Sequence, residues 1–242
     1  MTYLFTGLDT HIDKGFGVTA DAYKKSADFL QTNNFEHFNI TQQAEMPQNY
    51  LYRHSIELYL KSLIIIFHRK LNINYGNASF DSEEPEILIK QKWESLFKCH
   101  NIQILYEYWL NHLFLPNIAK LNIITPDYNW NNNIEFVEQL SIVSEYDSDS
   151  SYFRYPISKN SMLDEKKMSM QKIKIKKSES IIDKIKESKG RIMLLLDNND
   201  NIVEGFKQEK NILVEIKNNL KEISTYFDNF HMLVRDKLCD GM

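Results

Sequence analysis

Residues 50–70 read YLYRHSIELYLKSLIIIFHRK, and this stretch decides the fold. It contains neither Gly nor Pro and is mostly large and apolar, which predicts a long buried helix. Four polar residues interrupt it. His54, Glu57 and Lys61 follow the spacing i, i+3, i+7 and share one stripe, and Arg53 also lies one turn from Glu57. Because each charge has a partner, we expect the stripe to face another part of the protein, a cleft or a ligand.

The sequence on either side of this stretch predicts a mainly α-helical protein. Apolar residues recur at helical spacing, and Asn101 is a suitable capping residue for one of the helices. With 7 Gly and 5 Pro, the chain is short of the residues that a β-sandwich or barrel needs for its turns. A polar, mobile loop is expected over 72–84. The expected helices cover residues 19–30, 45–70, 85–97, 102–115, 134–146 and 208–238.

Composition and charge indicate a soluble protein with one large domain over residues 1–242. The length of 242 residues, the hydrophobic content of 43% and the charged content of 26% are ordinary for a globular protein. The formal charge of −4 gives no overall attraction to nucleic acid or to an anionic membrane. The N-terminus lacks the pattern of a signal peptide, no apolar run is long enough to span a membrane, and two cysteines make no disulfide framework. We therefore expect a cytoplasmic location.

Residues 162–206 differ from the rest and predict an insertion in the helical domain. Eleven Lys or Arg against five Asp or Glu between Lys159 and Arg191 give a local net charge of +6. The alternation of lysine and isoleucine over 172–177 is typical of an edge strand, and a short helix is expected over 178–188. Residues 191–196 and 201–206 around a polar turn predict a β-hairpin.

Motifs for cofactors and metals do not occur in the sequence. No Walker loop, GxGxxG, GxSxG, HExxH or paired-cysteine zinc pattern is present. Neither a cofactor nor a metal site is therefore expected.

Three fragments in order carry a family resemblance. They are YLYRHSIELYLKSLI at 50–64, KCHNIQILY at 98–106 and SSYFRYPIS at 150–158, and a long C-terminal helix follows them. Together they resemble the HEPN superfamily, especially a bacterial branch of helical proteins with an RHxxExxxK second helix and an FRYP segment. The resemblance covers roughly residues 20–235, apart from the basic insertion. It implies a HEPN-like helical bundle that forms a homodimer through its helices.

Many HEPN proteins are ribonucleases, and the resemblance implies an active site in which His follows Arg after four to six residues. The five arginines of this chain are Arg53, Arg69, Arg154, Arg191 and Arg235. None of them has a His at that spacing. The usual nuclease signature is therefore absent, and an equivalent site would have to assemble from separate segments.

The polar groups of the 50–70 stretch have two interpretations. A buried network of Arg53, His54, Glu57 and Lys61 could hold the helices in register. Alternatively, Arg53 or Lys61 could hold a phosphate while His54 transfers a proton near neutral pH. His100 is either part of a helix cap or a second imidazole facing His54, the pair that acid–base cleavage of RNA requires.

Two further groups complete the candidate residues. Arg154 lies between aromatic residues and before Pro156, so it is expected to be held rigidly, either paired with Glu57 or a helix C-terminus or in contact with a ligand. The basic stretch is either a solvated surface or a phosphate-attracting one, and the residues predicted for a nucleic-acid surface are Lys172, Lys174, Lys176 and Lys177.

Two hypotheses for function follow. The first is a HEPN-like module that binds RNA, a nucleotide or a protein partner, in bacterial antiphage defence or a toxin–antitoxin system, through Arg53, Glu57, Lys61 and Arg154. The second is a metal-independent ribonuclease with an atypical centre built from His54, His100, Arg53 and Arg154. RNA cleavage that is lost on replacing His54 and His100 would distinguish the second from the first.

Overall fold

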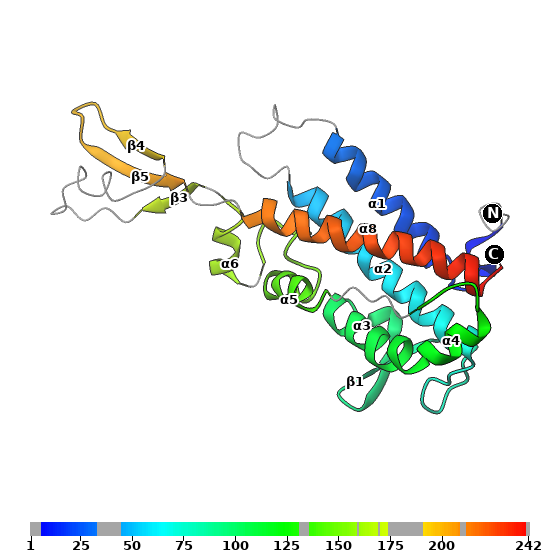
Figure 1. Ribbon diagram of the computed structural model, residues 1–242. Helices are drawn as coiled ribbons and strands as arrows, with labels where there is room; N and C mark the ends of the chain where they lie inside the picture. The colour runs from blue at the N-terminus through cyan, green and yellow to red at the C-terminus, as the bar shows by residue number, and fades with distance from the viewer. Residues whose placement is uncertain are drawn as a thin grey trace.

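A long central helix organises the structure, as the sequence predicts. The computed structural model describes residues 6–32, 45–130, 136–158, 160–168, 170–173, 191–208 and 212–240. Helix α2 (Glu45–Leu71) lies in the middle, with α1 (Phe16–Thr32) and α8 (Ile212–Leu238) packed along it (Figure 1). Nearly every α2 residue from Tyr52 to His68 is buried, so its apolar character on all sides reflects a helix that is covered all round.

The two outer helices are amphipathic in different ways. Helix α8 buries large apolar residues every three or four positions, including Ile216, Leu220 and Phe227. Helix α1 buries small residues, among them Gly17 and Ala20, and these allow it to approach its neighbours closely. A Cβ atom on Gly17 would lie 2.3 Å from the ring of His231 on α8. Glycine is therefore required where α1 begins.

A buried carboxylate joins the start of α1 to the other two long helices. Asp13 accepts hydrogen bonds from the backbone N–H of Gly17 at 2.9 Å and from the Ser62 hydroxyl of α2 at 2.6 Å. On α8, Nε2 of His231 and Nη1 of Arg235 each lie 3.5 Å from this carboxylate. Asp13 therefore connects segments from opposite ends of the chain.

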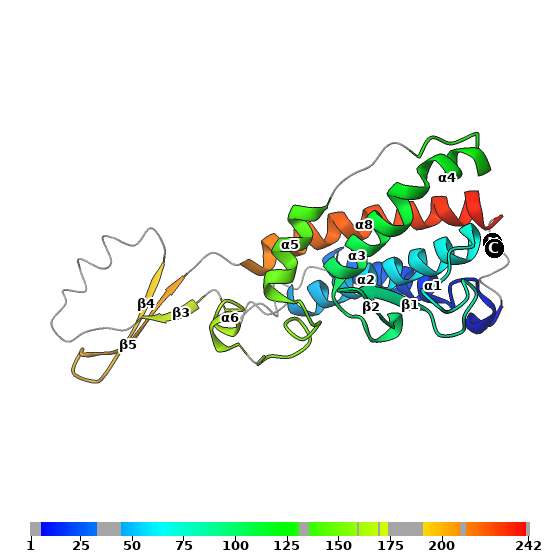
Figure 2. The same cartoon turned by 90° about the horizontal axis from the view of Figure 1, so that it is seen from below.

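Shorter helices form a second layer along α2 and α8 (Figure 2). They are α3 (Ile102–Tyr108), a π-helical turn (Trp109–Phe114), α4 (Ile118–Ile124) and α5 (Val137–Tyr146). Trp109 carries the contact between the layers, with its ring 6.4 Å from Phe67 of α2 and 5.3 Å from Phe230 of α8. The predicted helices over 102–115 and 134–146 are confirmed in this form, although residues 131–135 lie outside the described part.

The helix predicted over 85–97 is wrong. This segment forms a hairpin of β1 (Glu86–Ile89) and β2 (Lys92–Ser95), followed by a 3-10 turn (Leu96–Lys98). Lys90 and Gln91 make the turn with φ of 47° and 67°, the left-handed conformation of a two-residue hairpin turn. Such turns usually carry Asn-Gly or Asp-Gly, and Lys-Gln is no signal for one.

The predicted β-containing insertion projects from one end of the bundle as an arm (Figure 1). After α6 (Ser161–Glu165), strands β3 (Met170–Ile173), β4 (Ile192–Leu196) and β5 (Ile202–Gln208) form an antiparallel sheet in the order β3-β5-β4. The hairpin is confirmed. Of the edge strand predicted over 172–177, Lys172 and Ile173 belong to β3, which lies at an edge of the sheet, and residues 174–177 lie outside the described part. The helix predicted over 178–188 falls on residues that the structure does not describe. No described residue of these strands belongs to the apolar core of the bundle.

The loop over 72–84 is tied to the core rather than merely polar. Tyr75 is fully buried and stacks on the ring of His68, with centroids 3.8 Å apart.

Both cysteines, Cys99 and Cys239, are free thiols and are buried. None of the helices in the described ranges combines the length and the apolar character needed to cross a membrane.

Candidate functional site

The charges of α2 meet in one buried network centred on Glu57. Oε2 of Glu57 accepts from Nη1 of Arg53 at 2.6 Å, and Oε1 accepts from Nζ of Lys61 at 2.9 Å. Nδ1 of His100 lies 2.9 Å from the same Oε1 atom. The i, i+4 spacing within α2 accounts for the first two bonds, since it places these side chains one turn apart.

Local structure before α3 brings His100 to this carboxylate. The side chain of Asn101 caps α3 by accepting from the N–H groups of Gln103 and Ile104, both at 3.0 Å, as the sequence predicts. Arg53 also donates to the main-chain oxygen of His100. Lys61 donates to the Phe97 oxygen at 3.2 Å, so the network fixes residues 97–100 against α2.

Asp147, which follows α5, is the residue of this network that sequence reasoning missed. Its Oδ2 lies 3.0 Å from Nε of Arg53, an ion pair without the alignment of a hydrogen bond. Its Oδ1 accepts from the Tyr152 N–H at 2.8 Å. Asp147 comes directly after the helix predicted over 134–146, and no pattern in the sequence connects it with α2.

The two carboxyl groups of the network differ in pKa. Burial opposes the charged form of Glu57, but the positive charges of Lys61 and Arg53 outweigh it and lower the pKa. For Asp147, burial is the stronger effect and raises the pKa despite Arg53. Arg53 is fully buried and Lys61 nearly so, whereas half of the His100 side chain is exposed. This arrangement favours the structural interpretation for Arg53, Glu57 and Lys61.

His54 lies in a separate cluster of rings. It stacks on Tyr50 with centroids 5.6 Å apart and meets Tyr23 of α1 edge-on at 4.5 Å. Burial lowers the pKa of His54, so the neutral imidazole is favoured near neutral pH. Its Nδ1 atom is buried, with no hydrogen-bond partner among the described residues. His54 and His100 therefore have different neighbours rather than one shared partner.

Arg154 extends the ring cluster towards the surface. Its guanidinium lies 5.6 Å from the ring centre of Tyr50 and 5.9 Å from that of Tyr155, and Nη2 donates to Ser150 Oγ at 3.3 Å. These contacts replace the expected pairing of Arg154 with Glu57, whose oxygens Arg53, Lys61 and His100 already occupy. Arg154 itself is exposed.

A pocket of about 460 Å³ opens beside Arg154, between the start of α2 and the 153–156 segment. The residues that line it are Met46, Pro47, Tyr50, Phe153, Arg154, Tyr155, Pro156 and Lys167. Aromatic and apolar side chains form most of the wall, with an arginine at its edge. Neither His54 nor His100 lines this pocket.

Lys167 holds the 153–156 segment in place. Its side chain is buried, and Nζ donates to the Tyr155 oxygen at 2.8 Å and lies 2.7 Å from Oδ1 of Asp164. The same amine lies 4.5 Å from the ring centre of Tyr152. A buried lysine with these partners fixes the backbone that follows Arg154, and no pattern in the sequence indicates this role.

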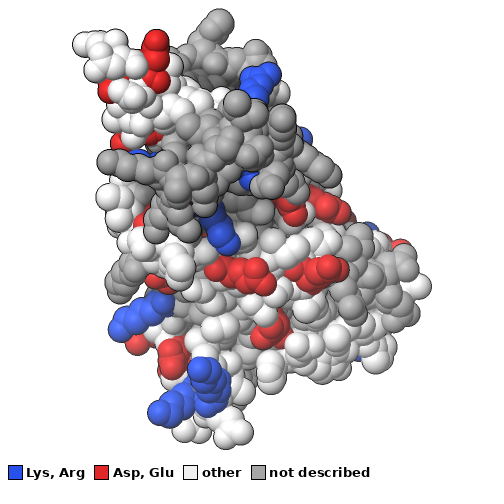
Figure 3. All heavy atoms as spheres, turned by 90° about the vertical axis from the view of Figure 1, so that its left-hand side faces the viewer, with Lys and Arg blue, Asp and Glu red and all other residues white. Residues whose placement is uncertain are grey.

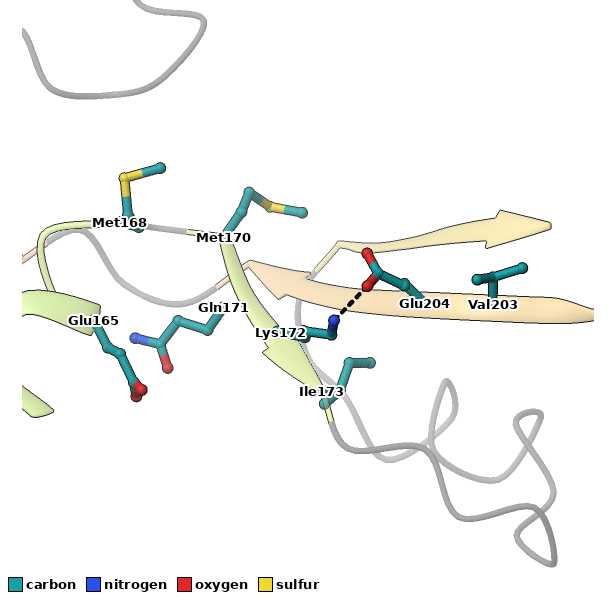
Figure 4. Close-up of a pocket in the computed structure, with 8 residues that line it drawn as sticks. All are labelled: Glu165, Met168, Met170, Gln171, Lys172, Ile173, Val203 and Glu204. Atoms are coloured by element: carbon teal, nitrogen blue, oxygen red, sulfur yellow. Dashed lines mark hydrogen bonds and ion pairs between the residues drawn. The ribbon is translucent and has the colours of Figure 1, made fainter. Parts of the chain in front are cut away.

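The predicted nucleic-acid surface is described only in part. Lys172 on β3 forms an ion pair with Glu204 on β5 (Figure 4). Lys174, Lys176 and Lys177 lie outside the described residues. Among the described residues on the face towards the arm, both acidic and basic side chains are exposed (Figure 3).

A larger pocket of about 780 Å³ lies between α6 and the sheet (Figure 4). Met168, Met170 and Ile173 form much of its wall. Lys172 is the one cation among its described lining residues, and Glu204 already neutralises it. This pocket is therefore less suited to an anionic ligand than the one beside Arg154.

Comparison of the chain with protein-family models, with curated proteins and with solved structures found no match. The described residues contain no cluster of three or more His, Cys, Asp or Glu side chains that could hold a metal ion.

Proposed function

We propose that this chain is a HEPN-like binding module whose ligand is a nucleotide unit, free or at an accessible position of RNA. The pocket beside Arg154 carries the proposal. It combines an exposed guanidinium with the rings of Tyr50 and Tyr155, and its size falls in the range of about 300–1,000 Å³ that small-ligand sites occupy.

Each part of a nucleotide has a partner in this pocket. A guanidinium can donate two parallel hydrogen bonds to a phosphate, and its fixed fork makes that contact directional. A base can stack on an aromatic ring such as that of Tyr155, an interaction worth about 1–3 kcal/mol per base. The Lys167 amine is already bound to the Tyr155 main-chain oxygen and to Asp164, so it holds the wall of the pocket in place and offers no free charge to the ligand.

A compact ligand suits the surface better than a long duplex. Proteins that bind duplexes use several unpaired cations along the phosphate backbone. Here the formal net charge of the chain is −4, and Lys172, the described member of the predicted basic surface, is already paired with Glu204. These features favour recognition of one phosphate and one base.

Titration calorimetry tests the proposal with adenosine monophosphate, with adenosine and with a short oligoadenylate. We expect the monophosphate to bind and adenosine, which lacks the phosphate, to bind at least about tenfold more weakly, because a charge-assisted hydrogen bond is worth about 1.5–3 kcal/mol. Comparison of the oligonucleotide with the monophosphate distinguishes RNA from a free nucleotide as the ligand.

Variants connect the binding to the pocket. Arg154→Ala should weaken monophosphate binding about tenfold or more, and Arg154→Lys should recover part of it through the charge alone. Arg191→Ala, at an exposed arginine on the arm, is the matched control and should bind normally. Equal affinity of the unmodified chain and Arg154→Ala, or no binding of any phosphate-bearing ligand, rejects the proposal.

The second candidate function is a metal-independent ribonuclease, and one observation favours it. His100 is half exposed and its Nδ1 is oriented by the Glu57 carboxylate, an arrangement that also prepares histidines for proton transfer. Mixed RNA incubated with the unmodified chain and with His54→Ala and His100→Ala variants tests it. Cleavage that is absent, or equal in all three samples, excludes this candidate.

A further inference from the structure

The outer edge of β4 is prepared for pairing with another strand. The sheet order β3-β5-β4 places β4 at an edge, and within the described part of the chain it pairs with β5 alone. Its five residues, Ile-Met-Leu-Leu-Leu over 192–196, include no charge and no Pro. Proteins usually protect an edge strand with charged residues or Pro, and an edge without them is a template for the addition of another strand. The opposite edge, β3, does carry a charged residue, Lys172.

The hydrogen-bond phase of β4 identifies which groups point outwards. At one end, the Arg191 oxygen accepts from the Gln208 N–H at 2.8 Å, and at the other the Asp197 N–H donates to the Asn201 oxygen at 2.8 Å. Because antiparallel pairing alternates along a strand, the odd-numbered residues of β4 face β5 with their main-chain groups. The N–H and C=O groups of Ile192, Leu194 and Leu196 therefore point away from the sheet.

We propose that β4 pairs with β4 of a second copy of this chain, antiparallel and with Leu194 opposite Leu194. In this register Ile192 of each copy faces Leu196 of the other, so all the outward main-chain groups of the strand obtain partners. One two-fold axis relates the copies, and the two sheets become continuous.

Side chains and charges support this register. Met193 of one copy comes opposite Leu195 of the other, and these side chains are 48% and 44% exposed in the single chain. Arg191 and Asp197 lie three residues on either side of Leu194, so each arginine comes opposite the aspartate of the other copy. The pairing thus covers exposed apolar side chains and matches opposite charges at both ends.

The described strands extend away from the helical bundle. The arm projects beyond the end of the bundle, and β4 lies apart from the long helices α1, α2 and α8 in both views (Figures 1 and 2). Two bundles joined through their arms would lie on opposite sides of the joint sheet. This dimer differs from one formed through the helices, which the family resemblance implies.

Mass measurement on the full chain, by light scattering after gel filtration, tests the proposal. We expect a dimer for the unmodified chain and a monomer for Leu194→Lys, which places two ammonium groups opposite each other on the axis. Val203→Lys is the matched control, because Val203 is a 65% exposed residue of the central strand β5. It should remain dimeric. Far-UV circular dichroism checks that both variants retain their helices.

Disulfide trapping tests the register. Cα atoms of directly opposed, hydrogen-bonded antiparallel residues lie about 5.5 Å apart, within disulfide range. Leu194→Cys should therefore cross-link under mild oxidation, whereas Val203→Cys should not, and the native Cys99 and Cys239 are buried. A monomeric unmodified chain, a dimer that Leu194→Lys leaves intact, or equal cross-linking of the two cysteine variants overturns the proposal.

Discussion

Nδ1 of His100 lies 2.9 Å from Oε1 of Glu57, although 43 positions separate the two residues. The same carboxylate receives Arg53 and Lys61, so the segment before α3 is joined to α2 through one buried acid. The Glu57 carboxylate is difficult to replace, because it supplies negative charge to each of the buried cations beside it.

Replacement of Glu57 should therefore destabilise the protein strongly. Glu57→Gln keeps the shape but leaves the buried Lys61 without a counter-charge and Arg53 with Asp147 alone, and we expect a loss of about 3–5 kcal/mol in the free energy of unfolding. Urea denaturation measures it. Glu107→Gln, at an exposed position of α3, is the control and should change stability by less than about 0.5 kcal/mol. Similar losses in both variants would contradict the importance of the network.

Acidification should destabilise the fold through His68. Burial lowers its pKa from 6.5 to about 4, while Nδ1 bonds to the Ile73 oxygen at 2.6 Å and Nε2 to the Tyr108 hydroxyl at 2.9 Å. Between these pH values the unfolded chain takes up a proton that the folded protein does not. Stability is therefore complete above pH 6.5 and is lost as the pH falls towards 4, by roughly 3 kcal/mol.

Urea denaturation at a series of pH values between 7 and 4 tests this expectation. His68→Phe removes the titrating group, so the variant should be less stable at neutral pH but should lose less stability on acidification. The pKa of His54 is also lowered, and its contribution has the same sign. An unchanged slope in His68→Phe would show that another group is responsible.

Substitution of Gly17 should be costly even though alanine favours helices. The Cβ of Gly17→Ala would lie 2.3 Å from the His231 ring and 2.8 Å from Oδ2 of Asp13, so the ring must rotate or one of the helices must shift. We expect thermal denaturation to show a loss of about 1–3 kcal/mol, the usual effect of overpacking. In a His231→Ala background the same substitution should cost much less, because the clashing ring is absent. An equal loss of stability in both backgrounds would show that the His231 ring is not the cause of the destabilisation.

Lys167 should control the binding pocket without contributing a free charge to it. Lys167→Met removes the bonds to the Tyr155 oxygen and to Asp164, and we expect weaker binding of adenosine monophosphate by calorimetry as the 153–156 segment loses its support. The neighbouring Lys166→Met is the control, since the Lys166 side chain is exposed and lies over Tyr146. Equal affinities for the two variants would show that the segment keeps its conformation without Lys167.

The long helices could be predicted from sequence because their apolar spacing is sustained over many turns. The 85–97 segment could not, because the spacing of Ile87, Leu88 and Trp93 suits a short helix and a hairpin equally well. The deciding feature is the left-handed conformation of Lys90 and Gln91, two residue types that seldom adopt it. The choice between a helix and a hairpin over 85–97 therefore depends on tertiary packing and not on the local apolar spacing.

The candidate site was predicted in part. The spacing of Arg53, Glu57 and Lys61 is a property of one helix, so their meeting could be foreseen. His100 was expected in a helix cap or facing His54, and its contact with Glu57 was not foreseen. Asp147 and Lys167 could not be foreseen, because each reaches its partners through a chain fold that no local pattern records. Arg154 was identified as a contact residue from its aromatic neighbours in sequence, but its stacking on Tyr50 depends on distant backbone.

The carboxylate of Asp13 has a consequence for how the molecule assembles. Its partners come from the beginning of α1, from α2 and from α8, so this junction forms only when segments near the two termini have met. Closing so long a loop carries a large entropic cost, and contacts between such distant segments slow folding. We infer that the junction is completed late. In a chain still emerging from the ribosome, Asp13 lacks its contacts with His231 and Arg235 until α8 has been synthesised.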